Sequence, residues 1–420
     1  MKHFGIISPP VSGHIHPFAA LGRELLARGH RVTCFQMADL EEKIRDEGID
    51  FRPIGLGDHP VGSLPRSLRR LGQLSGVAAL RFTIRAVERT SIMMCRDGPA
   101  AIKAAGIDAL LVDQMEPAGG AVAEHLGVPF VTVCNALAIN RDPVVPPPFT
   151  GWPYQDNWRA RLRNRAGYAA FDWVMRPITQ VIAGYRRQWK LAPLRSPDDS
   201  FSKLAQICQM PREFDFPRTV LPPSFHYVGP LRRAATSIPF PWELLDGRPL
   251  VYASLGTLQN SREPVFRCFA EACSGLNVQL VLSHGGGLTS SEAANLPGQP
   301  VVVRYAPQLD LLARACLTLT HAGLNTVLDS LTNGVPLIAV PITYEQPAIA
   351  RRIEWTGVGR SIPLEKLHPI RLRNVIREAL DDGVSREAAG RIGAAVARAG
   401  GVTRAADVVE AALPETRKYQ

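Results

Sequence analysis

Residues 317–346, LTLTHAGLNTVLDSLTNGVPLIAVPITYEQ, decide the fold. The stretch opens with the apolar run LTLT, which is typical of a buried strand, and then has the spacing of a helix beginning near Leu324 or Asn325. The apolar run 335–341, VPLIAVP, predicts a second strand directly after that helix. A strand, a helix and a further strand in succession form the unit of a parallel sheet. The stretch therefore predicts an α/β architecture.

The same alternation continues on both sides of this stretch. Strands are predicted in the first half at 3–8, 31–36, 109–114 and 129–134, and in the second half at 250–255, 278–283, 301–306, 317–322 and 335–341. Apolar residues at 18, 21, 25 and 26, followed by Gly29, predict a helix from Pro17 to Arg28. We therefore expect two Rossmann-like, doubly wound parallel-sheet domains that face each other across a cleft.

Proline-rich stretches without periodicity place the expected domain limits. The predicted organisation is an N-terminal domain at 1–230, an interdomain linker at 231–247, a C-terminal domain at 248–395, and a C-terminal helix at 396–420. We expect that last helix to pack back on the N-terminal domain.

Composition limits the class of protein. The chain has 420 residues, of which 46% are hydrophobic and 20% charged, as in a globular protein of about two domains. It contains no apolar run of the length that spans a membrane, and its first residues do not resemble a signal peptide. The seven cysteines form no C-x-x-C pair, so we expect reduced thiols in the cytoplasm, with neither disulfides nor a zinc site.

The formal net charge of +10 is unevenly distributed. Residues 157–190 interleave arginine with tryptophan, tyrosine and phenylalanine. One interpretation is a solvated helical face above core aromatics. The other is peripheral attachment to an anionic membrane, on the inner face of the cytoplasmic membrane, with arginines on phosphates and aromatics at the interface. Nucleic-acid binding ranks lower because no nucleic-acid-binding module is recognisable.

Ligands of doubly wound sheets bind beyond the carboxyl ends of the strands, so functional residues are expected in the loops there. Gly323 precedes a helix N-terminus, which favours an anion, and Asn325 and Thr326 add donors. His321 is placed to reach a phosphate oxygen, and the carboxylate of Asp329 suits two sugar hydroxyls.

Further candidates follow other predicted strands: Ser254, Gly256 and Thr257 as a second phosphate contact, Tyr305 as a base-stacking ring, and Glu345 and Gln346 in another cleft-facing loop. Singly, each has an ordinary interpretation, such as a helix cap or a core ring. Their order along the chain, each after a strand, favours a nucleotide site. The chain lacks the Walker and G-x-G-x-x-G motifs, which counts against an NTPase or a nicotinamide enzyme.

The segments YAPQ, HAGLNTVLDSLTNG and YEQ together resemble the donor-binding signature of family 1 nucleotide-sugar glycosyltransferases, which have the two-Rossmann GT-B fold. By this resemblance Tyr305 stacks on the base and Gln308 helps to hold the nucleotide. The diphosphate is bound by His321, Asn325 and Thr326, and the ribose by Asp329. The sugar is bound by Glu345 and Gln346. The resemblance implies that the domain at 1–230 binds the acceptor and the domain at 248–395 binds the nucleotide sugar. It also implies UDP-glucose as the co-substrate and no cofactor. The plant signature has Trp, Trp, Glu and Asp where this chain has Tyr305, Leu324, Asp329 and Glu345.

The family's catalytic base lies in a G-H-x-x-P pattern, which GHIHP at 13–17 matches, and its activating aspartate falls on Asp113. His14 is expected in the loop before the first helix, whose N-terminus would disfavour imidazolium and keep the ring available as a base. Asp113 ends a strand of the same sheet and would orient that ring. His16 matches no functional position and is interpreted as a capping or cleft-lining residue. The chain has no D-x-D motif, so inverting transfer without a metal ion is expected.

Acceptor identity rests on a closer resemblance, carried mainly by the first half. The segments LVDQMEPAGGAVAEHLGVPF, CNALAINRDP, SLGTLQ and AGGVTRAADVVEAAL are similar to those of bacterial family members that glucosylate carotenoids, which makes zeaxanthin the expected acceptor. A sterol, a macrolide or a polyphenol remains an alternative. From other classes, a nucleotide-sugar epimerase or a non-catalytic nucleotide-sugar-binding protein remains open, although His14 and Asp113 favour deprotonation of an acceptor.

Overall fold

The computed structural model describes residues 1–74, 76–232, 238–257 and 262–413. Within them, seven parallel strands form a first sheet in the order β3-β2-β1-β4-β5-β6-β7. These strands are β1 (His3–Ile7), β2 (Arg31–Gln36), β3 (Asp50–Pro53), β4 (Ala109–Asp113), β5 (Phe130–Cys134), β6 (Gln206–Cys208) and β7 (Phe225–Tyr227). The central strands β1, β4 and β5 are mostly apolar and almost entirely buried because helices cover both faces of a parallel sheet.

A second parallel sheet has the order β10-β9-β8-β11-β12-β13 within the described residues. Its strands are β8 (Leu250–Ser254), β9 (Gln279–Ser283), β10 (Val301–Val303), β11 (Ala315–Thr320), β12 (Leu337–Ala339) and β13 (Gly359–Ser361). In both sheets the strand order reverses beside the first strand, between β1 and β4 and between β8 and β11. These reversal points are where doubly wound sheets bind ligands. Two doubly wound sheets were predicted, and the structure has them.

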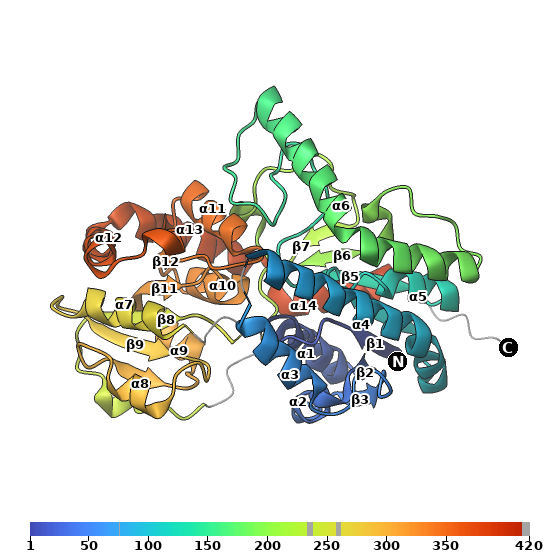
Figure 1. Cartoon of the computed structure of the whole chain (residues 1–420), viewed down its shortest axis with the longest axis horizontal. Coiled ribbons are helices and arrows are strands. Elements are labelled where there is room, and N and C mark those ends of the chain that lie inside the picture. Colours follow the sequence, from blue (N-terminus) through green and yellow to red (C-terminus); the bar gives the residue numbers. More distant parts are fainter. Residues whose placement is uncertain (75, 233–237, 258–261, 414–420) are drawn as a thin grey trace.

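Helices pack on the two sheets (Figure 1). With the first sheet lie α1 (Ser12–Ala27), α2 (Glu41–Asp46), α3 (Ser63–Gly72), α4 (Gly76–Ala105), α5 (Gly119–Leu126) and α6 (Trp158–Gln188). With the second lie α7 (Glu263–Cys273), α8 (Ser290–Ala294), α9 (Gln308–Leu312), α10 (Leu324–Thr332), α11 (Gln346–Trp355), α12 (Pro369–Asp381) and α13 (Gly383–Ala399). Among the described residues, no helix is both long and apolar enough to cross a bilayer. All seven cysteines are free thiols.

The last helix, α14 (Gly401–Ala412), packs against the first sheet's helices although it follows the second domain in sequence. Its Ala405 and Val409 are buried in the core of the first domain. Glu410 accepts hydrogen bonds from Arg28, at 2.7 Å, and pairs with His30 at 2.8 Å. The expected boundary at residue 395 falls inside α13, and α13 and α14 meet at Gly400. Residues 233–237 of the expected linker and 414–420 of the expected C-terminal helix lie outside the described residues, so the domain limits remain our proposal.

The first helix begins earlier than the sequence predicts, at Ser12 instead of Pro17. Pro17 lies inside α1 and has no N–H to donate to the carbonyl of Gly13, four residues earlier. That carbonyl accepts a hydrogen bond from the Asn325 side-chain amide instead, at 2.9 Å. The helix therefore passes through the proline because the other domain satisfies the carbonyl that the proline leaves free.

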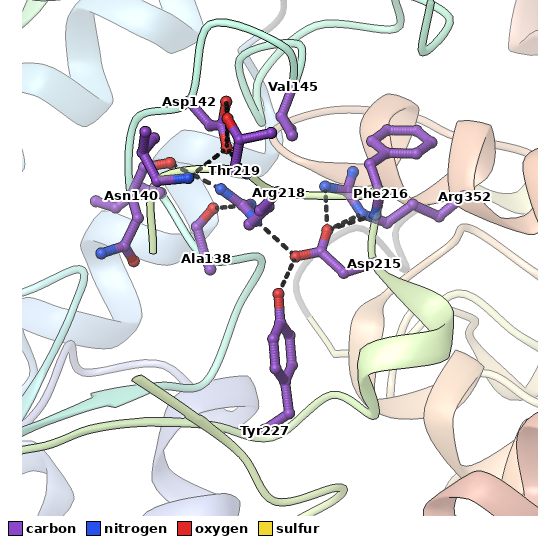
Figure 2. Close-up of polar contacts among 12 residues, drawn as sticks. Ala138, Asn140, Asp142, Val145, Asp215, Phe216, Arg218, Thr219, Tyr227 and Arg352 are labelled. Carbon is purple, nitrogen blue, oxygen red and sulfur yellow. Dashed lines mark hydrogen bonds and ion pairs between the residues drawn. The ribbon is translucent and has the colours of Figure 1, made fainter. Parts of the chain in front are cut away.

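The two domains also meet at a buried ionic contact, shown in Figure 2. The Asp215 carboxylate accepts hydrogen bonds from Arg218 Nε at 2.7 Å, from the Tyr227 hydroxyl at 2.9 Å, and from Arg352 Nη2 of α11 at 2.7 Å. Burial raises the pKa of Asp215, but the two guanidinium groups lower it by more, so its pKa lies below the usual range. Arg352 also stacks on the Phe216 ring. This contact joins α11 firmly to the first domain.

Candidate active site

The predicted catalytic pair lies at the reversal point of the first sheet. His14 is in the first turn of α1, directly after β1, and Asp113 is the last residue of β4. His14 Nδ1 and Asp113 Oδ2 are 2.8 Å apart. The expected position of His14 in a loop is therefore wrong by one helical turn, but the two side chains meet at the carboxyl edge of the sheet as expected.

Two further groups hold the Asp113 carboxylate in place. Asn135, directly after β5, donates its side-chain amide to Asp113 Oδ2 at 2.8 Å, and the Met115 backbone N–H donates to Oδ1 at 2.8 Å. Gln209, directly after β6, donates to the Asn135 carbonyl. Asp113 is 1% exposed, and a buried carboxylate with three donors is fixed in orientation. It can therefore orient the imidazole and keep the proton on Nδ1, leaving Nε2 free to accept another.

The electrostatics of His14 differ from the sequence-based expectation. Desolvation lowers the pKa of His14, but the charge and hydrogen bond of Asp113, with the charges of Glu345 and Glu116, raise it above its ordinary value. The pKa of His14 therefore shifts upward, opposite to the lowering expected from the helix N-terminus, because the charge and hydrogen bond of Asp113 outweigh it. They stabilise the imidazolium, which is the form a general base takes during the reaction.

Glu116 is a second carboxyl group beside the pair, and the sequence analysis did not identify it. It is 5% exposed, and its Oε1 atom has no hydrogen-bond partner among the described residues. Burial and the nearby Asp113 charge raise its pKa to about 8, while His14 lowers it. Glu116 is therefore largely protonated at neutral pH, and Asp113 is the carboxylate that serves His14.

Asn325, in the first turn of α10, connects the two halves of the site. Its amide nitrogen donates to the Gly13 carbonyl, and its side-chain oxygen accepts from Gln209 at 3.1 Å and from Arg232 at 3.0 Å. Asn325, the predicted diphosphate ligand, thus crosses the domain interface and bonds to the residue that directly precedes His14, the predicted base. Thr326, next in α10, is buried.

His321 follows β11 at the reversal point of the second sheet. Burial lowers its pKa to about 4, so the ring is neutral. A Cβ atom at Gly256 would lie 2.9 Å from this ring, and one at Gly323 would lie 2.5 Å from it. Both glycines are therefore required by the His321 ring, whereas the sequence analysis attributed Gly323 to the approach of an anion. Ser254 ends β8 and accepts from the Gly256 N–H at 3.2 Å, and Thr257 is exposed.

The predicted nucleotide and ribose ligands gather around Asp329, one turn after Asn325 on the same face of α10. Gln308, the first residue of α9, donates to Asp329 Oδ2 at 2.6 Å, and its oxygen accepts from the Tyr252 hydroxyl at 3.1 Å. Tyr305 follows β10 and is 51% exposed, so a face of its ring is open to a planar group. Asp329 Oδ1 accepts from Arg232 Nε at 2.6 Å.

The predicted sugar ligands lie in the loop between β12 and α11. The Gln346 side-chain oxygen accepts the backbone N–H groups of Ile342 and Thr343, at 2.8 and 2.9 Å, and so holds the loop's shape. Desolvation raises the pKa of Glu345, and the His14 charge lowers it. Glu345, the predicted sugar ligand, and His14, the predicted base, therefore lie close enough for the charge of each to shift the pKa of the other.

Backbone strain marks the same two loops. Ala322, between His321 and Gly323, has φ 64°, and Tyr344, before Glu345, has φ 54°. Left-handed conformations are rare for residues other than glycine and occur often at functional sites. Within the described residues, no group of three His, Cys, Asp or Glu side chains is arranged to hold a metal ion.

Comparison with known proteins identifies the family. Residues 82–394 match the family described as “UDP-glucoronosyl and UDP-glucosyl transferase”, and residues 12–133 match the “Glycosyltransferase family 28 N-terminal domain”. The chain belongs to the UDP-glycosyltransferase family. It is thus an enzyme of the class that the predicted donor signature indicates.

Two relatives span the full length of this family member. A zeaxanthin glucosyltransferase of Pantoea ananas is 39% identical, with 98% of this chain and 96% of that protein covered. One of Pseudescherichia vulneris is 36% identical, with 98% of each covered. The crystal structure of the calicheamicin glycosyltransferase CalG4 superposes with a TM-score of 0.75 at 22% identity, covering 98% of each chain, and confirms the GT-B fold.

Proposed function

We propose that this glycosyltransferase transfers glucose from UDP-glucose to a hydroxyl group of the carotenoid zeaxanthin, with inversion at the anomeric carbon. Full-length similarity to two zeaxanthin glucosyltransferases supports this acceptor. The observation that carries the proposal is the meeting of the His14–Asp113 pair with Asn325 and Glu345 of the other domain.

In the proposed reaction His14 Nε2 takes the proton of the acceptor hydroxyl. Asp113 orients the ring through Nδ1 and stabilises the imidazolium, as the aspartate of a serine-protease triad does. The acceptor oxygen attacks the anomeric carbon from the face opposite UDP, and the C–O bond to the diphosphate breaks. Negative charge then grows on the diphosphate, which the N-terminal N–H groups of α10 and the neutral His321 ring are suited to receive.

The donor is proposed to lie along the second sheet's carboxyl edge. Tyr305 would stack on uracil, while Gln308 and Asp329 would hold the ribose side. Ser254, Gly256, Thr257, Gly323, Asn325 and Thr326 would surround the diphosphate with His321, and Glu345 and Gln346 would bind glucose. These roles rest on the family signature and on the positions of these residues at strand ends.

The test is incubation with UDP-glucose and a panel of zeaxanthin, a sterol and a flavonoid, followed by mass spectrometry. We expect zeaxanthin glucosides as the main products. Glucosylation of the sterol or flavonoid with zeaxanthin unchanged would assign a different acceptor class. Epimerised UDP-sugar, or hydrolysis alone, would refute the transferase proposal.

We also propose that α6 places the enzyme on an anionic membrane, where an acceptor this apolar is dissolved. Trp158, Leu162 and Trp173 are 70%, 60% and 74% exposed, and helical spacing puts them on one face of α6 with the exposed Arg165 and Arg176. The helix projects from the body of the molecule in Figure 1 and packs against α4. Exposed tryptophans between arginines match the headgroup region of an anionic bilayer.

Vesicle flotation tests this contact. The enzyme is expected to float with phosphatidylglycerol vesicles and less with phosphatidylcholine ones. A Trp158→Ser, Trp173→Ser double variant should lose flotation, while Ile370→Ser, which removes an exposed apolar residue of α12, should not. Equal flotation of the double variant and the control would contradict the role of α6.

A further inference from the structure

Arg232 is a cation in the donor region to which the family signature assigns nothing. It lies five residues after β7, at the end of the first domain, and its side chain is 21% exposed. Its Nε donates to Asp329 Oδ1 at 2.6 Å, its Nη2 to the Asn325 side-chain oxygen at 3.0 Å, and its Nη1 to Gln209 Oε1 at 3.2 Å. One guanidinium thus joins the first domain to two expected donor ligands.

These bonds occupy the groups that a donor would need. Asp329 has both carboxylate oxygens engaged, one by Arg232 and the other by Gln308. The Asn325 side chain is engaged as well, by Gly13 through its nitrogen and by Gln209 and Arg232 through its oxygen. A carboxylate accepts up to about four hydrogen bonds, so ribose hydroxyls that bind Asp329 either share its oxygens with these partners or replace one of them. Gln308 lies within the second domain, so Arg232 is the partner whose displacement would also release an interdomain contact.

The surroundings of Arg232 favour an anion. Lys43 of α2 donates to Ser12 Oγ at 2.7 Å, at the start of α1. Desolvation, and then the charges of Lys43 and Arg232, lower the pKa of His16 to about 4, so all three groups lie near one another. Asp329 is the carboxylate that pairs with Arg232, and Glu47 is the acidic group that acts on Lys43. The N-terminus of α10, beside Asn325, adds its partial positive charge.

We propose that Arg232 is a donor-binding residue that exchanges Asp329 for the diphosphate of the nucleotide sugar. The ribose takes the Asp329 oxygens, and the released guanidinium pairs with phosphate oxygens, for which its planar fork is suited. The positive charge then faces the bond that breaks as UDP leaves, in a chain that has no D-x-D motif for a bridging metal ion. The inference rests on the proposed function only in requiring a UDP-linked donor.

The alternative on the same contacts is that Arg232 only holds Asp329 in place for the ribose. The two roles predict different dependence on phosphate. A phosphate ligand affects the binding of UDP and leaves uridine nearly unchanged. A support for Asp329 affects UDP and uridine equally, because both carry the ribose.

Isothermal titration of UDP and uridine distinguishes them, with wild type, Arg232→Gln and Arg232→Lys compared. The control is Arg248→Gln, which removes an exposed ion pair with Asp246. Loss of a charge-assisted contact predicts UDP binding weakened about 10- to 100-fold in Arg232→Gln, with uridine within about 2-fold of wild type. Arg232→Lys keeps the charge without the fork, so its loss should be intermediate. It also serves as the folded reference if the glutamine variant is unstable.

Equal weakening of UDP and uridine would overturn the proposal in favour of a supporting role, and unchanged UDP binding in Arg232→Gln would overturn it altogether. No acceptor enters these titrations, so an error in the acceptor would leave their outcome intact. Failure of wild type to bind UDP at all would refute the donor assignment together with this inference. The salt dependence of UDP binding should also be weaker in Arg232→Gln than in the Arg248→Gln control.

Discussion

Replacing Glu116 by Gln should stabilise the protein, and increasingly so as the pH rises. The folded-state pKa of about 8 lies above the ordinary value of 4.5, because burial and the Asp113 charge disfavour the carboxylate. Between pH 4.5 and about pH 8 the folded chain therefore binds one proton more than the unfolded chain does. The free energy of unfolding falls as the pH rises through that range. Each unit corresponds to 1.36 kcal/mol, so at pH 7 the loss is about 3 kcal/mol. Glutamine keeps the shape of the protonated acid and removes this loss.

The assay is thermal and urea unfolding of wild type and Glu116→Gln at several pH values from 4.5 to 8.5. The two proteins should be about equally stable near pH 4.5, with a difference that grows to about 3 kcal/mol at pH 7. Glu42→Gln, at an exposed position of α2, should show no such trend. A Glu116→Gln variant that is equally stable or less stable than wild type at pH 7 would show instead that the folded protein stabilises an ionised Glu116 carboxylate.

Three further predictions concern the domain interface and the chemistry. Pro17→Ala restores an N–H that competes with Asn325 for the Gly13 carbonyl. The free energy of unfolding should therefore rise by about 1 kcal/mol, measured by thermal melting, while turnover falls up to about tenfold, measured by steady-state kinetics. Unchanged turnover would count against that interdomain bond. Arg352→Ala breaks a buried ion pair and should lower the free energy of unfolding by about 3 kcal/mol, measured by urea titration. Arg391→Ala breaks an exposed ion pair and should lower it by less than about 1 kcal/mol. Equal losses in the two variants would contradict this ranking. EDTA should leave transfer unchanged, and loss of activity that magnesium restores would sink the metal-independent mechanism.

The sequence predicted the central strands of both sheets and the edge strand β10, but it missed four short strands at or next to the other edges. The central strands form continuous apolar runs because both faces are covered, which makes them visible in a single sequence. The missed strands β3, β6, β7 and β13 are three or four residues long and carry little hydrophobic signal. They become strands only because a neighbouring strand of the sheet pairs with them.

The site residues that the sequence predicted are those that lie near predicted strands, and the ones it missed include residues near strands that it missed. His14 and Asp113 were found because they match the family's base pattern and its activating aspartate, and His321 because it belongs to the donor signature; all three also lie near the ends of predicted strands. Asn135 directly follows a predicted strand and could have been found by the same rule. Gln209 could not, because it follows the unpredicted β6.

Contacts between distant segments were out of reach of the sequence altogether. The bond from Asn325 to Gly13 spans 312 residues, and no pattern in either segment indicates it. The direction of the His14 pKa shift was misjudged although its main cause was in hand. The charge and hydrogen bond of Asp113 raise this pKa most, and the charge of Glu345, which approaches from the other domain, adds to them.

In the mechanism we propose, His14, held by Asp113, deprotonates the acceptor. The most direct measurement is the rate of glucosyl transfer from UDP-glucose to zeaxanthin in wild type, His14→Ala and Asp113→Asn, with UDP affinity measured in parallel. We predict that turnover falls by roughly 10²–10⁴-fold in His14→Ala and by about 10- to 100-fold in Asp113→Asn, with UDP affinity nearly unchanged in both. Near-normal turnover in His14→Ala, or a matching loss of UDP affinity, would contradict the claim.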